Sequence, residues 1–261
     1  RCGIVKWLQE DDPERLERLW GRADDVRREA VGDEVHLRGL IEFGNHCART
    51  CAYCGLRAHN TGLPRYRMDA DEILECAHEA AGYGYGTVVL QSGEDYGYSA
   101  YWMADIVRRI KEETDLAVTL SLGERPDEDL ELWRRAGADR YLLRFETSDP
   151  DLYAAIHPPL GGRRSDRIAI LCRLRELGYE VGSGVMIGIP GQTWDALADD
   201  IELFRDLDLD MIGVGPFIAH GETPLGRRAE EMMAPEGQQV PSDELTTYKV
   251  VALTRILCPL T

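Results

Sequence analysis

The chain has 261 residues, of which 44% are hydrophobic and 30% charged, a composition typical of a globular protein with one sizeable domain or one α/β barrel. Its 47 acidic residues outnumber the 30 basic ones and give a net charge of −17, which argues against a nucleic-acid backbone or an anionic membrane as a partner. No apolar run approaches the roughly 18 residues needed to span a bilayer. Seven cysteines, an odd number with three in one short loop, indicate a reducing cytoplasm rather than a disulfide framework.

An N-terminal segment precedes the main predicted fold. Leu16 and Leu19 recur at helical spacing between charged residues, so Asp12–Arg28 is predicted to be a helix. We expect residues 1–34 to form a helical extension and residues 35–261 to form one domain, a partial (β/α) barrel.

From residue 35 onward, short apolar runs rich in β-branched residues alternate with longer amphipathic segments. Strands are predicted at Val35–Phe43, Thr87–Ser92, Ala117–Leu122, Arg140–Glu146, Gly182–Ile189 and Met211–Ile218. Helices are predicted to begin after Asp69 and to cover Trp102–Glu113, Asp127–Ala136, Ser165–Leu177, Trp194–Leu207 and Ser242–Leu257, with a long loop at Glu230–Pro241. This alternation predicts parallel strands joined by right-handed crossovers. An open doubly wound sheet fits the alternation equally well, but six strands favour a TIM-type (β/α) barrel, partial or complete.

Three cysteines follow the first predicted strand as Cys47-x3-Cys51-x2-Cys54. Cysteine thiolates are the usual ligands of iron–sulfur clusters, and three of them can hold three corners of a cubane, leaving the fourth iron open to another molecule. The alternative is structural zinc, but zinc requires four closed ligands, and His46 adjoins Cys47 too closely to serve well as the fourth. We therefore expect a 4Fe–4S cluster on these three cysteines.

Polar residues gather where the second and third predicted strands end. Ligand-binding groups in parallel α/β folds come from the carboxyl ends of strands. The second strand ends in Gln91-Ser92-Gly93-Glu94, which is either a ligand-binding turn or a tight turn with a solvated acid. Thr119 and Ser121 share one face of the third strand. Hydroxyl groups inside a barrel need partners, either neighbouring side chains or a ligand.

The fourth predicted strand carries Arg144 and Glu146 among apolar residues. Buried charges are costly unless paired, so these two either pair with each other or face ligands. In the second case Glu146 would meet a ribose hydroxyl or an amino group, and Arg144 a carboxylate or another anion. Arginine binds carboxylates through two parallel hydrogen bonds. Arg163, Arg164 and Arg167 are further candidates for this role, and chemistry alone does not choose among them.

The last two strand ends carry weaker signals. The glycine-rich stretch Gly188–Thr193 would let a backbone approach a flat ring, although a simple turn explains it as well. His220, after the sixth strand, is either a proton carrier or substrate contact, or a hydrogen-bonded surface group.

Taken together, these segments resemble the radical S-adenosylmethionine (SAM) enzymes, and among them the HydE-type maturases of iron–iron hydrogenase, a family near biotin synthase and methylornithine synthase. The resemblance runs from about Leu16 to the end of the chain. It is carried by Ile41–Phe43, Cys47–Arg57, Tyr66–Met68, Val89–Asp95, Val118–Glu124, Arg140–Thr147, Gly188–Thr193 and Gly213–Ile218. Family members continue into a seventh and an eighth strand, so we expect the barrel to be incomplete at the C-terminal side of this chain.

The resemblance implies a 4Fe–4S cluster and SAM as cofactors, with reductive cleavage of SAM to methionine and a 5′-deoxyadenosyl radical. It implies cofactor contacts from Tyr53, Ser92, Gly93, Glu94, Glu146, Arg167 and Met186. It implies an organometallic substrate, an iron carbonyl–cyanide precursor bound to cysteine, in contact with Gln91, Thr119, Ser121, Arg144 and Phe217, with Arg144 as the catalytic anion anchor. An electron donor such as flavodoxin or ferredoxin, and other hydrogenase maturases, are the implied partners.

Two other functions remain open. A methylornithine-synthase-like or biotin-synthase-like enzyme would use the same radical on a small amino-acid-like substrate, and the second of these needs an auxiliary cluster for which no ligand set is evident. A non-catalytic iron–sulfur assembly scaffold would bind a partner without cleaving SAM, but such a scaffold has no need of polar strand ends.

Overall fold

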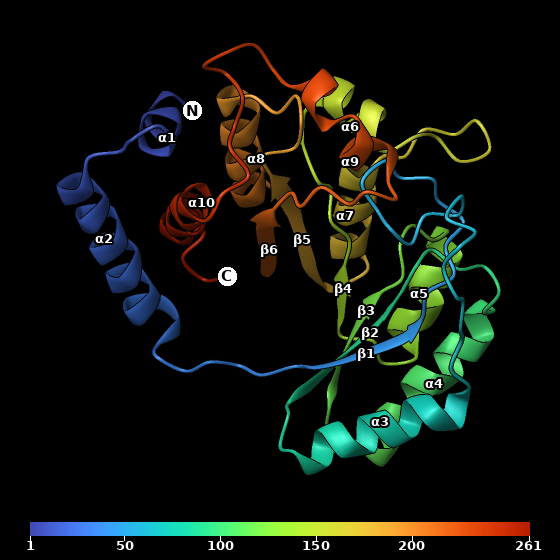
Figure 1. The fold of residues 1–261 in the computed structure, drawn as a ribbon. Coiled ribbons are helices and arrows are strands. Elements are labelled where there is room, and N and C mark those ends of the chain that lie inside the picture. Colours follow the sequence, from blue (N-terminus) through green and yellow to red (C-terminus); the bar gives the residue numbers. More distant parts are fainter.

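In the computed structural model, which describes residues 1–261, six parallel strands form one sheet whose spatial order follows the sequence. The strands are β1 (Gly39–Gly44), β2 (Thr87–Ser92), β3 (Ala117–Ser121), β4 (Arg140–Leu142), β5 (Glu180–Ile187) and β6 (Met211–Pro216). A doubly wound sheet reverses its strand order at a switch point, whereas a (β/α) barrel does not. The prediction of a partial (β/α) barrel is therefore confirmed, and β1 and β6 form the two edges of the sheet (Figure 1).

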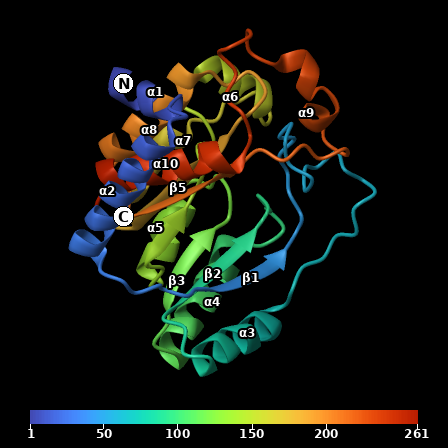
Figure 2. The same ribbon diagram turned by 60° about the vertical axis from the view of Figure 1, so that its left-hand side comes forward.

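The helices that connect the strands cover the outside of the sheet (Figures 1 and 2). They are α3 (Ala70–Gly82), α4 (Ala100–Glu113), α5 (Asp127–Arg135), α7 (Arg167–Glu176) and α8 (Trp194–Asp206). The short helix α6 (Pro150–Ile156) precedes α7 in the same connection. Helices α1 (Cys2–Leu8) and α2 (Pro13–Val31) precede β1, and α9 (Pro224–Arg227) and α10 (Glu244–Leu257) follow β6. The helix predicted after Asp69 begins with a full capping box, in which Asp69 and Glu72 each accept a backbone N–H of the other. None of the helices has both the length and the apolar composition required to cross a bilayer.

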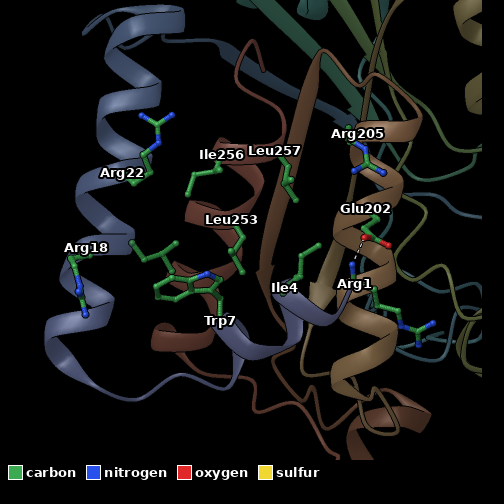
Figure 3. Close-up of a pocket in the computed structure, with 12 residues that line it drawn as sticks. Arg1, Ile4, Trp7, Arg18, Arg22, Glu202, Arg205, Leu253, Ile256 and Leu257 are labelled. Carbon is green, nitrogen blue, oxygen red and sulfur yellow. Dashed lines mark hydrogen bonds and ion pairs between the residues drawn. The ribbon is translucent and has the colours of Figure 1, made fainter.

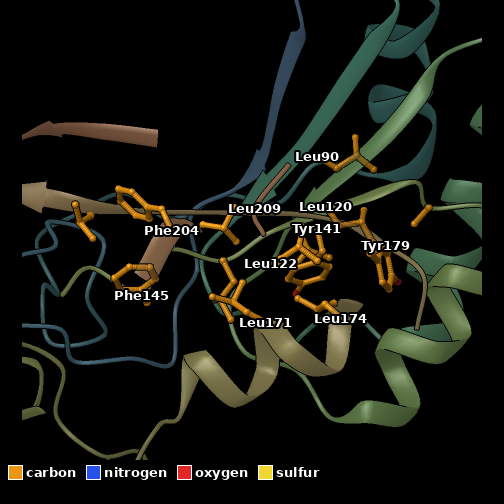
Figure 4. Packing of buried hydrophobic residues seen from close by; sticks show 14 of the residues in the cluster. Leu90, Leu120, Leu122, Tyr141, Phe145, Leu171, Leu174, Tyr179, Phe204 and Leu209 are labelled. Atoms are coloured by element: carbon orange, nitrogen blue, oxygen red, sulfur yellow. The ribbon is translucent and has the colours of Figure 1, made fainter. Parts of the chain in front are cut away.

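The main hydrophobic core lies between the sheet and these outer helices (Figure 4). Strand β1 shows the resulting asymmetry, because Ile41 and Phe43 are buried while Leu40 and Glu42 on the opposite face are exposed. Successive side chains on a strand point to opposite faces, so the inner face of the sheet is the one that stays accessible. Polar residues near the carboxyl ends of the strands lie on that inner face.

The N-terminal helices pack against the far end of the sequence. Helices α1 and α2 both contact α10, which also contacts β6 (Figure 1). Buried Lys249 of α10 donates hydrogen bonds to the carbonyl oxygen of Leu8 and to Asp11 Oδ1, each at 3.1 Å. The boundary at residues 34 and 35 remains a prediction.

Most predicted strand ends lie within one or two residues of the observed ones, but the first and the fourth predicted strand are each about four residues too long. The segment before Gly39 is not part of β1, and Val35 and Leu37 are 83% and 64% exposed. The segment predicted as a strand to Glu146 leaves the regular ladder after Leu142, for reasons given with the site below.

The structure also adds short elements that the sequence did not predict, namely α1, α6, α9 and a single 3-10 turn at Ala229–Met232. That turn occupies the beginning of the predicted loop Glu230–Pro241. These elements are at most seven residues long, too short for a periodic apolar pattern to identify them.

Candidate active site

The cysteine loop leaves the carboxyl end of β1 and is fixed by backbone hydrogen bonds to other strand ends and helices. The N–H of Ala48 donates to the carbonyl of Glu94 after β2 at 2.8 Å, and the N–H of Ala52 donates to the carbonyl of Ile156 in α6 at 2.7 Å. Cys51 is buried, Cys47 and Cys54 are half-buried, and none of the three forms a disulfide. The three predicted ligands are thus brought together on one anchored loop.

A single arginine holds the second half of this loop. Arg65 donates hydrogen bonds to the carbonyl oxygens of Leu56, Arg57 and Asn60 at 2.8, 2.9 and 3.2 Å, and to that of Asn45. The planar fork of arginine allows one side chain to serve several acceptors at once. No sequence motif predicted this role.

The thiols of Cys51 and Cys54 are held in an environment that disfavours their charged form. Burial raises the pKa of Cys51 to about 12, and burial also raises the pKa of Cys54. No three His, Cys, Asp or Glu side chains converge on one point as ligands of a single ion would. In a cubane cluster each thiolate binds a different iron, so convergence on one point is not required.

The turn after β2 touches the cysteine loop directly. A Cβ atom at Gly93 would lie 2.3 Å from the carbonyl oxygen of His46 and 2.7 Å from Cys47 Cβ, so only glycine fits there. The carboxylate of Glu94 accepts hydrogen bonds from Arg49 Nε at 2.8 Å and from the N–H of Glu124 at 2.9 Å. Because protein groups already occupy Glu94, the part of this turn left for a ligand is the backbone around Gly93.

The strand end that carries Arg144 and Glu146 contains one extra residue. Leu142 pairs with Gly182, and Glu146 with Val185, so four steps on one side oppose three on the other. Such a bulge bends the chain and redirects its side chains.

The hydroxyl of Ser183 fills the irregularity, since it donates to the carbonyl of Leu143 at 2.8 Å and accepts the N–H of Phe145 at 3.2 Å. The bulge also places Glu146 at φ 66°, a left-handed conformation that is strained for a residue with a side chain.

Arg144 and Glu146 contact each other but leave polar atoms without hydrogen-bond partners. Arg144 Nε lies 3.4 Å from Glu146 Oε2, yet both atoms are buried without a hydrogen bond, as is Thr119 Oγ1 on β3. Burial raises the pKa of the Glu146 carboxyl, against the opposing effects of Arg144 and Arg167. Buried polar atoms in native proteins are normally hydrogen-bonded, so Arg144 Nε and Glu146 Oε2 mark a place for a polar ligand after β4, and Thr119 Oγ1 is a further unpartnered group on β3.

Arg167 is the arginine that the structure brings to this place. It is the first residue of α7, it is buried, and its Nη1 donates to the carbonyl oxygen of Arg144 at 2.6 Å. Its Nε donates to Glu124 Oε1 at 3.0 Å, and Glu124 also accepts from Arg49 Nη2 at 2.6 Å. Sequence reasoning missed Arg49, because nothing in the spacing of the cysteines shows that it turns toward Glu124.

The remaining predicted residues divide into two groups. Gln91 and Ser121 are half-buried on the inner face, and Gln91 donates to Glu42 Oε1 at 3.1 Å. Phe217, in contrast, is 7% exposed and packs in a small apolar cluster with Tyr53 and Met186, behind the cysteine loop. The structure therefore gives Phe217 a packing position.

His220 lies over the turn after Cys54. Its Nε2 is 3.5 Å from the position that a Cβ atom at Gly55 would take, and its Nδ1 accepts the N–H of Glu222 at 3.1 Å.

These residues fit a cubane cluster with SAM. Three free thiols on one loop supply cluster ligands. The unpartnered Glu146 Oε2 and the nearby Arg167 guanidinium match a ligand that offers both donors and acceptors, and SAM carries an amino group, a carboxylate and ribose hydroxyls. The glycine cradle at Gly93 brings the β2 turn within contact of the first cysteine.

A cavity of about 610 Å³ lies away from this site, between α1, α2, α8 and α10 (Figure 3). Its floor includes Trp7 and Leu253, and Arg18 and Arg22 stand on the α2 side. It contains none of the predicted site residues, so its size does not identify it as the place of the chemistry.

Comparison with known proteins agrees with the geometry. The family pattern described as the Radical SAM superfamily matches residues 41–204. The chain is 49% identical over 243 residues to the [FeFe] hydrogenase maturase subunit HydE of Thermotoga maritima, which covers 93% of this chain and 66% of that protein. It is 28% identical over 254 residues to the 3-methylornithine synthase of Methanosarcina acetivorans, which covers 97% of this chain and 68% of that protein.

A solved structure shows the same fold. The crystal structure of methylornithine synthase (PylB) superposes with a TM-score of 0.84 at 27% identity, over 98% of this chain and 72% of that one. The chain thus spans about two thirds of the length of the proteins it resembles.

Proposed function

Because this chain belongs to the radical SAM superfamily, we propose that it acts in the maturation of [FeFe] hydrogenase. The observation that carries the proposal is the 49% identity with HydE over 93% of the chain, nearly twice the identity with the methylornithine synthase. The chain is a radical SAM enzyme of HydE-like sequence. The proposal adds a biological role to that classification.

Each site residue has a role in this proposal. Cys47, Cys51 and Cys54 hold the cluster. Arg167 binds the carboxylate of SAM, and Glu146 binds its amino group or a ribose hydroxyl. Once bound, the cluster and SAM supply a 5′-deoxyadenosyl radical. The contributions of the chain are to bind and orient, because preorganised contacts hold a reactive group against its target.

Further cofactor contacts come from the turn after β2, from the end of β5 and from the cysteine loop. The backbone of Ser92 and Gly93 passes beside the first cysteine, and Glu94 fixes that turn through Arg49. Met186 and Tyr53 provide apolar surface at the end of β5 and in the cysteine loop.

The substrate lies on the inner face of the sheet, against Gln91, Thr119, Ser121 and Arg144. Thr119 Oγ1 and Arg144 Nε are buried there without a hydrogen-bond partner. A guanidinium beside hydroxyl groups favours an anionic substrate, which agrees with a cyanide-bearing iron complex. Arg144 is already held by a hydrogen bond from its Nη2 to the carbonyl of Val185, so the anchor is preorganised.

An external one-electron donor is required, and we propose a flavodoxin or ferredoxin for this role. The other maturases of the hydrogenase are the further proposed partners.

The test has two stages. The protein is reconstituted anaerobically with iron and sulfide and incubated with SAM and dithionite, and 5′-deoxyadenosine is measured. It is then added to a hydrogenase maturation mixture that lacks HydE, and hydrogen evolution is measured. Deoxyadenosine with restored hydrogenase supports the proposal, whereas deoxyadenosine without restored hydrogenase contradicts the maturation role.

A methylornithine-synthase-like activity is the second candidate, favoured by the TM-score of 0.84 with PylB. It predicts that lysine increases deoxyadenosine formation and is itself converted to an isomer, which mass spectrometry with labelled lysine would detect. A HydE-like enzyme would leave lysine unchanged.

A further inference from the structure

Glu124, directly after β3, joins two parts of the site that lie far apart in the sequence. Its Oε2 accepts from Arg49 Nη2 at 2.6 Å, and its Oε1 accepts from Arg167 Nε at 3.0 Å. Arg49 stands between Cys47 and Cys51 in the cysteine loop, and Arg167 begins α7. One carboxylate therefore bridges the loop proposed to hold the cluster and the arginine proposed to hold SAM.

We propose that Glu124 is a positioning residue that fixes Arg167 for the carboxylate of SAM and ties that arginine to the cysteine loop through Arg49. This inference rests on the SAM-binding role of Arg167 in the proposed function.

The bridge is buried and its charges balance. The side chains of Arg49, Glu124 and Arg167 are 8%, 10% and 9% exposed, and Glu94, the second acid, is 2% exposed. Two arginines thus face two glutamates. Removing one partner of a buried ion pair leaves an uncompensated charge, so each member constrains the others.

The bridge leaves part of Arg167 free. A guanidinium has five N–H donors, and Arg167 uses one each for Glu124, the carbonyl of Arg144 and His157 Nε2. Burial, and then the nearby Arg167 and Arg49, lower the pKa of His157 to about 3, so this histidine is neutral and accepts a hydrogen bond. Two N–H donors remain, one on each Nη atom, which is the number that a carboxylate takes in a bidentate pair.

Ser165 reinforces the same carboxylate. Its hydroxyl donates to Glu124 Oε1, and it also shares a hydrogen bond of 2.6 Å with the hydroxyl of Tyr153 in α6. The position of Oε1, and with it that of Arg167 Nε, is therefore fixed from two sides.

The experiment compares SAM with decarboxylated SAM, which lacks the group that Arg167 would bind. Dissociation constants of both are measured by equilibrium dialysis on cluster-loaded wild type and on Glu124→Gln, with iron content determined for each sample. We expect Glu124→Gln to weaken SAM roughly 10- to 100-fold, as loss of a supporting contact to a ligand-binding group typically does. The dissociation constant of decarboxylated SAM should change by no more than about twofold, which is the typical deviation from additivity for independent sites.

Asp139→Asn is the matched control. Asp139 also accepts from a cation and from a backbone N–H, namely Lys111 Nζ at 3.0 Å and the N–H of Val118 at 2.7 Å, but it lies just before β4, at the opposite ends of the strands. It should leave both dissociation constants unchanged, although the melting temperature of the cluster-free protein should fall in both variants.

A gentler variant covers the case in which Glu124→Gln does not fold. Ser165→Ala removes only the hydroxyl that donates to Glu124. It should weaken the binding of SAM roughly 2- to 10-fold, which corresponds to the loss of one hydrogen bond. The binding of decarboxylated SAM should again be unaffected. Equal losses for both ligands, or no loss in either variant, would overturn the proposal. So would a wild type with no preference for SAM, because Arg167 would then not bind the carboxylate.

No hydrogenase precursor is present in these assays. A failed maturation test therefore does not contradict the inference about Glu124. A failed binding test on Glu124→Gln likewise does not contradict the maturation role.

Discussion

Replacing Gly93 by alanine should prevent cluster loading while the fold persists. The new Cβ atom would lie 2.3 Å from the carbonyl oxygen of His46 and 2.7 Å from Cys47 Cβ. Real Cβ contacts are essentially never shorter than 3.0 Å, so the two segments must separate by at least 3.0 − 2.3 = 0.7 Å. The β2 end is held in register with Gly44 of β1, so the loop is the part that moves.

The size of this shift separates stability from metal binding. Overpacking of this kind costs about 1–3 kcal/mol, against the roughly 5–15 kcal/mol by which a domain is folded. Metal–ligand distances, however, tolerate only about 0.2 Å. Cys47 Cβ must move from 2.7 to at least 3.0 Å, a shift of 0.3 Å that already exceeds this tolerance, and the adjoining His46 carbonyl must move by 0.7 Å, so the variant should fold and still bind little iron.

The assay is iron and sulfide content, with the absorbance of the cluster, after anaerobic reconstitution. Gly21→Ala is the matched control, because a Cβ at Gly21 in the middle of α2 meets nothing within 4 Å. It should load like the wild type and gain up to about 1 kcal/mol in stability. Normal iron content in Gly93→Ala would refute the reasoning, because it would show that the contact between the turn and the loop does not determine where Cys47 lies.

Three further outcomes are expected. Cys51→Ala should bind no stable cluster and form no 5′-deoxyadenosine. A cluster content or a deoxyadenosine yield at the wild-type level would show that this cysteine is not a ligand. Arg65→Ala should release the cysteine loop and increase trypsin cleavage after Arg57. Arg65→Lys should not restore protection, because lysine lacks the planar guanidinium that binds several carbonyl oxygens at once. An unchanged cleavage rate would contradict the role of Arg65. Asp200 is buried in α8 and accepts hydrogen bonds from Ser148 Oγ and Gln192 Nε2. Burial raises the pKa of Asp200 to about 7, so the folded state holds a proton that the unfolded chain releases near pH 4, and stability falls as pH rises between these two values. Between about pH 5 and 8 the free energy of unfolding of the wild type should drop by roughly 2–3 kcal/mol more than that of Asp200→Asn, as measured by urea titration. The same pH dependence of stability in both proteins would contradict this prediction.

The sequence was sufficient where the signal is local or periodic. The capping box at Asp69 and Glu72, the six strands and the spacing of the three cysteines each involve residues within a few positions of one another. The same reasoning identified Arg167 as a candidate, because it stands at the start of a helix that the pattern predicts.

The parts that were missed depend on partners far along the chain. The bulge at Arg144 and Glu146 arises because Ser183, about 40 residues later, supplies a hydroxyl to the irregular ladder. Arg49 meets Glu124 across a separation of 75 residues. Such contacts follow from the three-dimensional arrangement of the strand ends, and neither residue type nor spacing reveals them.

Strands that lie in space in the same order as in the sequence have a consequence for biosynthesis. Each strand can pair with the one made just before it, so the sheet can grow from β1 to β6 as the chain leaves the ribosome. The first two helices cannot follow this course, because the partner of Leu8 is Lys249, made 241 residues later. Helices α1 and α2 are thus made long before α10, and they can dock in their final place only after α10 has formed.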